Sequence, residues 1–87
     1  MNNPIAEIEN LRQSASNLRR MSIEISEGRT GLTSIMGQIG DVWQGTAADA
    51  FLESNEWVVK DMDKLRFRLD DLAAAMDRAA DGLGVGG

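Results

Sequence analysis

The sequence predicts an all-α protein: an antiparallel helix-turn-helix hairpin that pairs into a dimeric four-helix bundle. Apolar residues recur at alternating spacings of three and four over two long stretches. The chain has a single proline, near its start, and a tight turn at its midpoint separates the two stretches. Two long amphipathic helices that pack only on each other leave their flanks exposed, so a second hairpin is expected to cover them. We expect one domain, 1–87.

The first helix is expected over residues 4–42. Asn3 is a favourable N-cap, and Pro4 is a favourable first helical residue. The expected contact face is apolar at all but two of its positions. This face comprises Ile8, Leu11, Ala15, Leu18, Ser22, Ile25, Arg29, Leu32, Met36, Ile39 and Trp43. Glycine costs roughly 1 kcal/mol relative to alanine inside a helix, so bending or fraying is expected near residues 28–31.

A tight turn is expected over residues 43–46. Gly45 suits the position that follows a helix C-terminus. Thr46 and Asp49 have the spacing of a capping box, in which a hydroxyl and a carboxylate satisfy the first backbone N–H groups of a helix. The chain therefore reverses here and starts a second helix.

The second helix is expected over residues 47–82. Its expected contact face is apolar except at Ser54. This face comprises Ala47, Phe51, Ser54, Val58, Met62, Leu65, Leu69, Leu72, Met76, Ala79 and Leu83. Two consecutive steps of four residues, from Ser54 to Met62, form a stutter that locally relaxes a supercoil. The glycine-rich segment 83–87 is expected to be a flexible tail.

The composition argues against catalysis and metal binding. The chain has no histidine, cysteine or tyrosine, which removes zinc-finger spacings, thiol nucleophiles and Ser-His dyads, so no catalytic residue, metal site or cofactor is expected. A net charge of −5 is unfavourable for binding nucleic acid. The clustered carboxylates lack EF-hand spacing, and we expect them to form a solvated surface. They are Asp61, Asp63, Asp70, Asp71, Asp77 and Asp81.

Neither a membrane helix nor a Sec-type signal peptide is expected. No stretch approaches the roughly 20 apolar residues of a transmembrane helix. Residues 1–20 contain polar residues at short intervals and no apolar run typical of a signal peptide. If the protein leaves the cell, it uses another route.

The segment Trp43-Gln44-Gly45 has two interpretations. A large aromatic residue at the end of the contact face, followed by a turn glycine, can close the end of the bundle. The same residues can instead form an exposed recognition signal.

Three further aromatic residues are candidates for a partner or dimer surface. Phe51 lies on the expected contact face of the second helix. Trp57 lies about 100° from that face and is expected in the core or the dimer interface. Phe67 lies roughly opposite Leu65, and the pattern leaves open whether it is exposed for docking.

The chain resembles the WXG100 family, the ESAT-6-like proteins. The resemblance rests on Trp43-Gln44-Gly45 at the midpoint of a hairpin of this length, and continues through WQGTAADAF to the second tryptophan, Trp57. It covers essentially the whole chain. It implies a small non-enzymatic protein that is made in the cytoplasm and exported folded by a type VII (ESX-type) secretion system, without a Sec signal peptide.

The resemblance also implies partners. It implies a homodimer, or a heterodimer with a WXG100-like relative, and recognition by the type VII secretion ATPase. In the family the W-x-G turn acts together with a C-terminal element, often Tyr-x-x-x-Asp/Glu, as a composite export signal. This chain has no tyrosine. The alternative is therefore an intracellular adaptor or chaperone that pairs with the helical domain of a larger type VII substrate.

Overall fold

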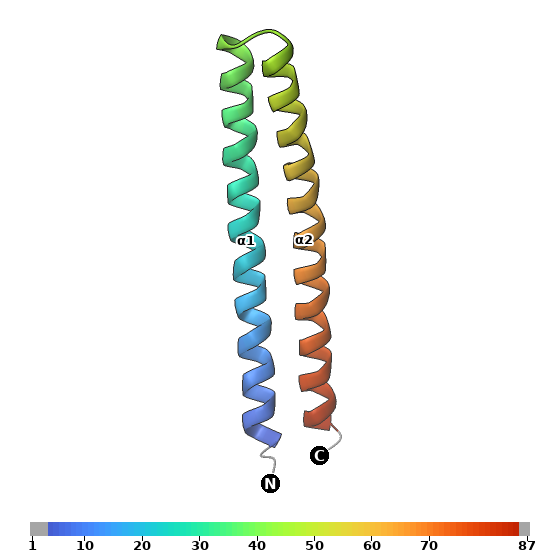
Figure 1. Cartoon of the computed structure of the whole chain (residues 1–87). Coiled ribbons are helices and arrows are strands. Elements are labelled where there is room, and N and C mark those ends of the chain that lie inside the picture. Colours follow the sequence, from blue (N-terminus) through green and yellow to red (C-terminus); the bar gives the residue numbers. More distant parts are fainter. Residues whose placement is uncertain (1–3, 86–87) are drawn as a thin grey trace.

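The computed structural model describes residues 4–85 and consists of two long helices (Figure 1). Helix α1 spans Pro4–Val42 and helix α2 spans Thr46–Val85. They run antiparallel, side by side, along a body that measures 63 × 18 × 15 Å. No strand is present between residues 4 and 85, so the described chain is all-α, as the sequence predicts.

The turn between the helices is short. Gly45 adopts a φ of 115°, a left-handed backbone conformation that residues with a side chain rarely adopt. The N–H of Trp43 donates to the carbonyl of Ile39 at 2.8 Å, and the N–H of Asp49 donates to the carbonyl of Gly45 at 3.0 Å. These two bonds close the last turn of α1 and the first turn of α2. Gly45 therefore supplies the reversal that brings the helices together.

The end of α2 differs from the expectation. The helix continues to Val85, whereas residues 83–87 were expected to form a tail. The last two residues of that segment, 86 and 87, lie outside the described residues. The glycines near this end thus do not stop the helix before Val85.

Helix α1 uses the contact face that its spacing predicts. The residues of that face are buried or half-buried, apart from Trp43, which stays partly exposed. The expected fraying near residues 28–31 is not seen, because α1 is continuous from Pro4 to Val42. Packing along the whole length of α2 outweighs the propensity cost of the glycines, since tertiary contacts commonly override intrinsic preference.

Helix α2 turns a different face toward α1 than the sequence predicts. The contact face shifts by one residue at most positions and comprises Ala48, Leu52, Asn55, Val59, Met62, Arg66, Leu69, Ala73, Met76, Ala80 and Leu83. This series alternates steps of four and three without interruption, so the expected stutter from Ser54 to Met62 is wrong. Small side chains, Ala73 and Ala80 among them, let the helices approach closely, and the bulkier Leu72 is left outside.

The core of the single hairpin is small. Among the described residues, the buried apolar side chains are four alanines and Leu69, and Ser22 is the buried polar one. None of the larger side chains is fully buried. A hairpin with such a core gains little from hydrophobic burial, which is the main favourable contribution to folding. The isolated hairpin is therefore expected to need further burial for stability.

Ion pairs cross between the helices on one face. Arg12 Nη2 lies 2.8 Å from Asp81 Oδ1, and Arg19 Nη2 lies 2.5 Å from Asp77 Oδ2. Nearer the turn, Arg29 Nε lies 2.7 Å from an oxygen of Asp63. The aspartates of these pairs were expected to be solvated surface groups. Their side chains remain 31–65% exposed, and they also pair with arginines of α1.

We expect Asp77→Asn to lower the free energy of unfolding by up to about 1 kcal/mol, since partly exposed ion pairs contribute little. The carboxylate of Asp77 pairs with Arg19, and its Oδ1 lies 4.0 Å from Arg12 Nη1. One substitution therefore weakens two contacts. Urea unfolding at low and high salt checks this. The difference between the two proteins should shrink as salt screens the charges, and a salt-independent loss would contradict an electrostatic origin.

Candidate functional site

The turn presents an aromatic pair at the tip of the hairpin. The rings of Trp43 and Phe51 lie 5.8 Å apart between centroids, with their planes tilted by 49°. Each residue is 43% exposed, so the tip is partly packed and partly open to a partner. Gln44 and Gly45 beside them are exposed. The Trp43 side chain is thus neither fully buried at the end of the hairpin nor fully exposed.

We expect Trp43→Ala to cost about 1–2 kcal/mol of stability, less than the 3–5 kcal/mol of a fully buried aromatic residue. The contact with Phe51 accounts for the loss, and the exposed part of the indole explains why the loss stays small. Thermal unfolding followed by circular dichroism checks this. A loss as large as that of a core tryptophan would show that Trp43 is buried in solution, as in a bundle end.

An apolar stripe runs along one long face of the hairpin. On α2, exposed apolar side chains recur every seven residues, and each is 43–47% exposed. A seven-residue repeat keeps side chains on one side of a helix. On α1, three more exposed apolar side chains are separated by 14 and then by seven residues. The apolar stripe consists of Phe51, Val58, Leu65 and Leu72 on α2, and Met21, Ile35 and Val42 on α1.

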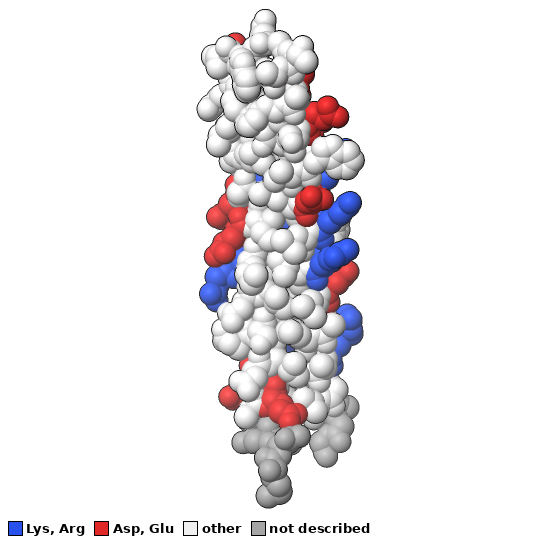
Figure 2. Space-filling view, viewed as in Figure 1, with Lys and Arg blue, Asp and Glu red and all other residues white. Residues whose placement is uncertain are grey.

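Both halves of the stripe lie on the face opposite the ion pairs. In each helix a stripe residue directly precedes a contact residue, as Leu72 precedes Ala73. An ion-pairing residue instead directly follows one, as Asp77 follows Met76. Antiparallel helices turn such equivalent positions to the same side. Figure 2 shows this face, with an uncharged band along most of its middle, charged groups along its two edges and an acidic group near its lower end.

Two predicted surface aromatics lie outside the stripe. Trp57 is 59% exposed, and Lys60 Nζ lies 4.8 Å from its ring centroid in a cation–π contact, so Trp57 does not belong to the core of the hairpin. Phe67 is 73% exposed and borders a small hollow beside Asp63 and Asp70 on the ion-paired side. The structure therefore brings Phe51 to the tip and the stripe, and separates it from Trp57 and Phe67.

Sequence reasoning missed the stripe as a separate surface. The contact face expected for α2 included Val58, Leu65 and Leu72, whereas these residues lie beside the observed contact face. The sequence of α2 did indicate a second surface, because it contains two adjacent series of apolar residues, each repeating every seven residues. A single partner helix covers one row, and two such rows are typical of a helix with two neighbours.

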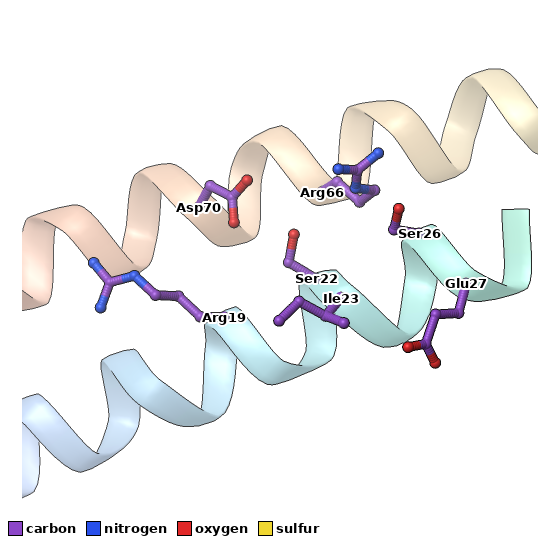
Figure 3. A pocket seen from close by; sticks show the side chains of 7 residues that line it. All are labelled: Arg19, Ser22, Ile23, Ser26, Glu27, Arg66 and Asp70. Atoms are coloured by element: carbon purple, nitrogen blue, oxygen red, sulfur yellow. The ribbon is translucent and has the colours of Figure 1, made fainter. Parts of the chain in front are cut away.

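A shallow groove of about 360 Å³ lies between the helices near their middle (Figure 3). The hydroxyls of Ser22 and Ser26 point across toward α2, whereas Glu27 points away from it. On the α2 side the groove has Arg66, whose Nε is buried without a hydrogen-bond partner, and Asp70. The groove is open and contains charges of both signs. Its two carboxylates do not face each other, because Asp70 lies on α2 and Glu27 points away from that helix.

Over residues 4–85, no three acidic, histidine or cysteine side chains are grouped so that they could hold a metal ion. Over the residues described, neither helix contains a stretch that is long and apolar enough to span a bilayer.

Comparison with known proteins identifies a family. The family model described as "WXG100: Proteins of 100 residues with WXG" matches residues 6–83 of this chain. The match thus includes both helices and the turn with Trp43 and Gly45. No curated protein and no solved structure matches the chain.

Proposed function

This chain belongs to the WXG100 family, and from that membership we propose that it is exported folded, as a dimer, by a type VII (ESX-type) secretion system. Proteins of this family are small, non-enzymatic secreted proteins, and the family points to the type VII route. The family match is the observation that carries the proposal. The protein is then made in the cytoplasm and leaves it by the type VII route.

The apolar stripe supports the dimeric state. Six of the seven large side chains of the stripe are about half exposed and Val42 is 85% exposed, while the contact faces of α1 and α2 bury mainly alanines. Contiguous exposed apolar surface of this kind marks an interaction site, and pairing of two hairpins into a four-helix bundle covers it. The partner is either a second copy of the chain or a WXG100-like relative.

The turn supports a role as part of the export signal. Trp43, Gln44 and Gly45 sit at the tip of the hairpin, where a large receptor can reach them without disturbing the helices. We propose that these residues, together with a second element, contact the type VII secretion ATPase. The 87 residues contain no tyrosine, and we propose that a partner chain supplies the Tyr-x-x-x-Asp/Glu element or that another sequence replaces it.

An immunoblot of culture filtrate from the native organism, with and without its type VII secretion ATPase, tests the proposal. A cytosolic marker excludes lysis. We expect the protein in the filtrate of cells that contain the ATPase, and its retention in cells that lack it. Appearance in both filtrates, with the marker absent, would contradict type VII export.

A second candidate function is that of an intracellular adaptor for the helical domain of a larger type VII substrate. Phe67 favours it, because this side chain is 73% exposed on the side away from Leu65, where a dimer formed through the stripe leaves it free. An adaptor stays in the cytosol while its larger neighbour is exported. Phe67→Ala should then weaken capture of that neighbour, and an unchanged complex would argue against this surface.

A further inference from the structure

A second groove lies between the helices on the ion-paired side of the hairpin, next to the turn, and we infer that it docks a basic amphipathic helix of another protein. The groove faces away from the apolar stripe, so a dimer formed through the stripe leaves it open. Docking there requires neither the export route nor the dimeric state of the proposed function.

This turn-side groove combines an apolar patch with charged side chains. It has a volume of about 350 Å³. Met36 and Val59 supply its apolar surface, and both are half-buried contact residues. The ion pair of Arg29 and Asp63 lines the groove away from the turn, and Glu56 lines it on the turn side. An aliphatic side chain of a partner therefore finds apolar surface here that the hairpin itself leaves uncovered.

The pairing of opposite charges along this side stops at the turn-side groove. On α2, acidic residues recur every seven positions and share one side of the helix. This acidic row consists of Asp49, Glu56, Asp63, Asp70 and Asp77. The corresponding row on α1 consists of Arg12, Arg19, Ser26, Thr33 and Gly40. Arginine thus meets aspartate toward the open end, as Arg19 meets Asp77, whereas Thr33 and Gly40 provide no cation near the turn.

The carboxylates beside the groove have no cation of their own. Asp49, Glu53 and Glu56 are exposed and form no ion pair within residues 4–85. Residues 30–59 include four acidic and no basic side chains, so this segment has a net charge of −4, against −5 for the whole chain. Lys60, the first basic residue after the turn, lies 4.8 Å from the ring centroid of Trp57. The matching cations are therefore left for a partner to supply.

These carboxylates do not stabilise the hairpin as a group. Glu53 lies four residues after Asp49 and three before Glu56, and like charges at these helical spacings are destabilising. Asp49 lies in the first turn of α2, where a carboxylate is favourable, but Glu53 and Glu56 lie beyond that turn. A basic partner replaces this repulsion with attraction, which gives the groove its preference for positive charge.

Two glycines of α1 leave room for a third helix. Gly40 belongs to the same row as Arg12 and Arg19, and Gly37 lies three residues before it. A Cβ built at either glycine meets no atom within 4 Å, so the packing of α1 against α2 requires neither. Both lower the helix propensity of α1. The open space lets the backbone of another helix approach α1 closely.

The turn-side groove fits a helix rather than an extended peptide. The backbone groups of α1 and α2 are bonded within their own helices, so the hairpin has no sheet edge that an extended peptide could join. A helix lying along the groove can place an apolar side chain over Met36 and Val59. Asp49 and Glu56 are seven residues apart, about 10.5 Å along α2, so two lysines or arginines at the same spacing on the partner match them.

Binding of a designed peptide tests this docking, with Trp57 as the reporter. Trp43→Phe removes the other tryptophan and keeps an aromatic ring beside Phe51. The probe is a synthetic helical peptide with leucines on one face and two lysines seven residues apart, and its counterpart has glutamates in place of the lysines. We expect the lysine peptide to change Trp57 emission in a saturable way, and the glutamate peptide to have no effect. Equal binding of both peptides, or of neither, would overturn the inference.

Removal of charge shows whether the acidic side chains beside the groove attract the peptide. Glu53→Gln/Glu56→Gln should weaken binding of the lysine peptide roughly tenfold at low salt, and less at high salt. The matched control Glu9→Gln/Glu24→Gln removes the same charge from exposed residues farther from the turn and should leave the affinity unchanged. If both pairs of substitutions weaken binding equally, net charge attracts the peptide and the inferred site is wrong.

Gly40→Leu fills the groove without changing any charge. Leucine favours a helix over glycine, so this variant should unfold at the same temperature as the parent or higher, yet it should lose binding of the lysine peptide. Gly31→Leu is the matched control, because Gly31 lies four residues before the stripe residue Ile35, on the other side of α1. It should bind the peptide as the parent does. Binding that survives Gly40→Leu would place the peptide elsewhere on the hairpin and contradict docking in the turn-side groove.

Discussion

Leu65→Asp is expected to convert the protein from a dimer to a monomer. Burial of a leucine side chain contributes about 1.5–3 kcal/mol, and a dimer of two identical chains loses two such side chains at once. A loss of about 4 kcal/mol corresponds to a roughly thousandfold weaker dimer, and native mass spectrometry should find the 9.5 kDa species.

Phe67→Asp is the matched control for this experiment. It introduces the same charge two residues away, at a side chain that is 73% exposed on the other side of α2. The control should remain dimeric. If Leu65→Asp keeps the mass of a dimer, the stripe is not the interface, and if both variants are monomeric, the effect comes from net charge rather than from the stripe.

Gly45→Val is expected to lower the free energy of unfolding by about 2–3 kcal/mol, since a β-branched residue strongly disfavours a positive φ. A Cβ built on Gly45, whose φ is 115°, meets no atom within 4 Å, so the cost is one of backbone conformation and not of a steric clash. For a domain of this size the loss corresponds to a decrease in Tm of about 10–20 °C.

Gly37→Ala serves as its control, because Gly37 lies inside α1 and a Cβ there also has open space. This change should stabilise the protein by about 0.5–1 kcal/mol, since alanine favours a helix over glycine. Thermal unfolding of both variants checks the pair of predictions. An unchanged Tm for Gly45→Val would mean that the turn does not need its left-handed conformation.

The hairpin and its turn could be predicted from the sequence because their signals are local. The alternating spacing from Ile8 to Ile39 identifies the contact face of α1, and the Gly45–Thr46 step marks the end of one helix and the start of the next. The Trp43-Gln44-Gly45 motif at this turn also indicated the family that the family model identifies.

The contact face of α2 could not be chosen from the sequence, because two neighbouring rows are both apolar. The series that contains Leu65 is the more hydrophobic of the two. The series that contains Ala73 and Ala80 has smaller side chains, so it lets α2 pack closer to α1. The pairing of Asp63 with Arg29 was also missed. These features depend on the side chains that the other helix places opposite, and the spacing of residues within one helix does not specify them.

Export of the monomeric variant tests most directly the central claim that the protein leaves the cell as a folded dimer. Wild type, Leu65→Asp and Phe67→Asp are each expressed in the native organism, and filtrate and cytosol are immunoblotted beside a cytosolic marker. We predict that wild type and Phe67→Asp reach the filtrate, whereas Leu65→Asp is made but stays in the cells. Export of Leu65→Asp at the wild-type level, with its monomeric state established, would contradict the claim.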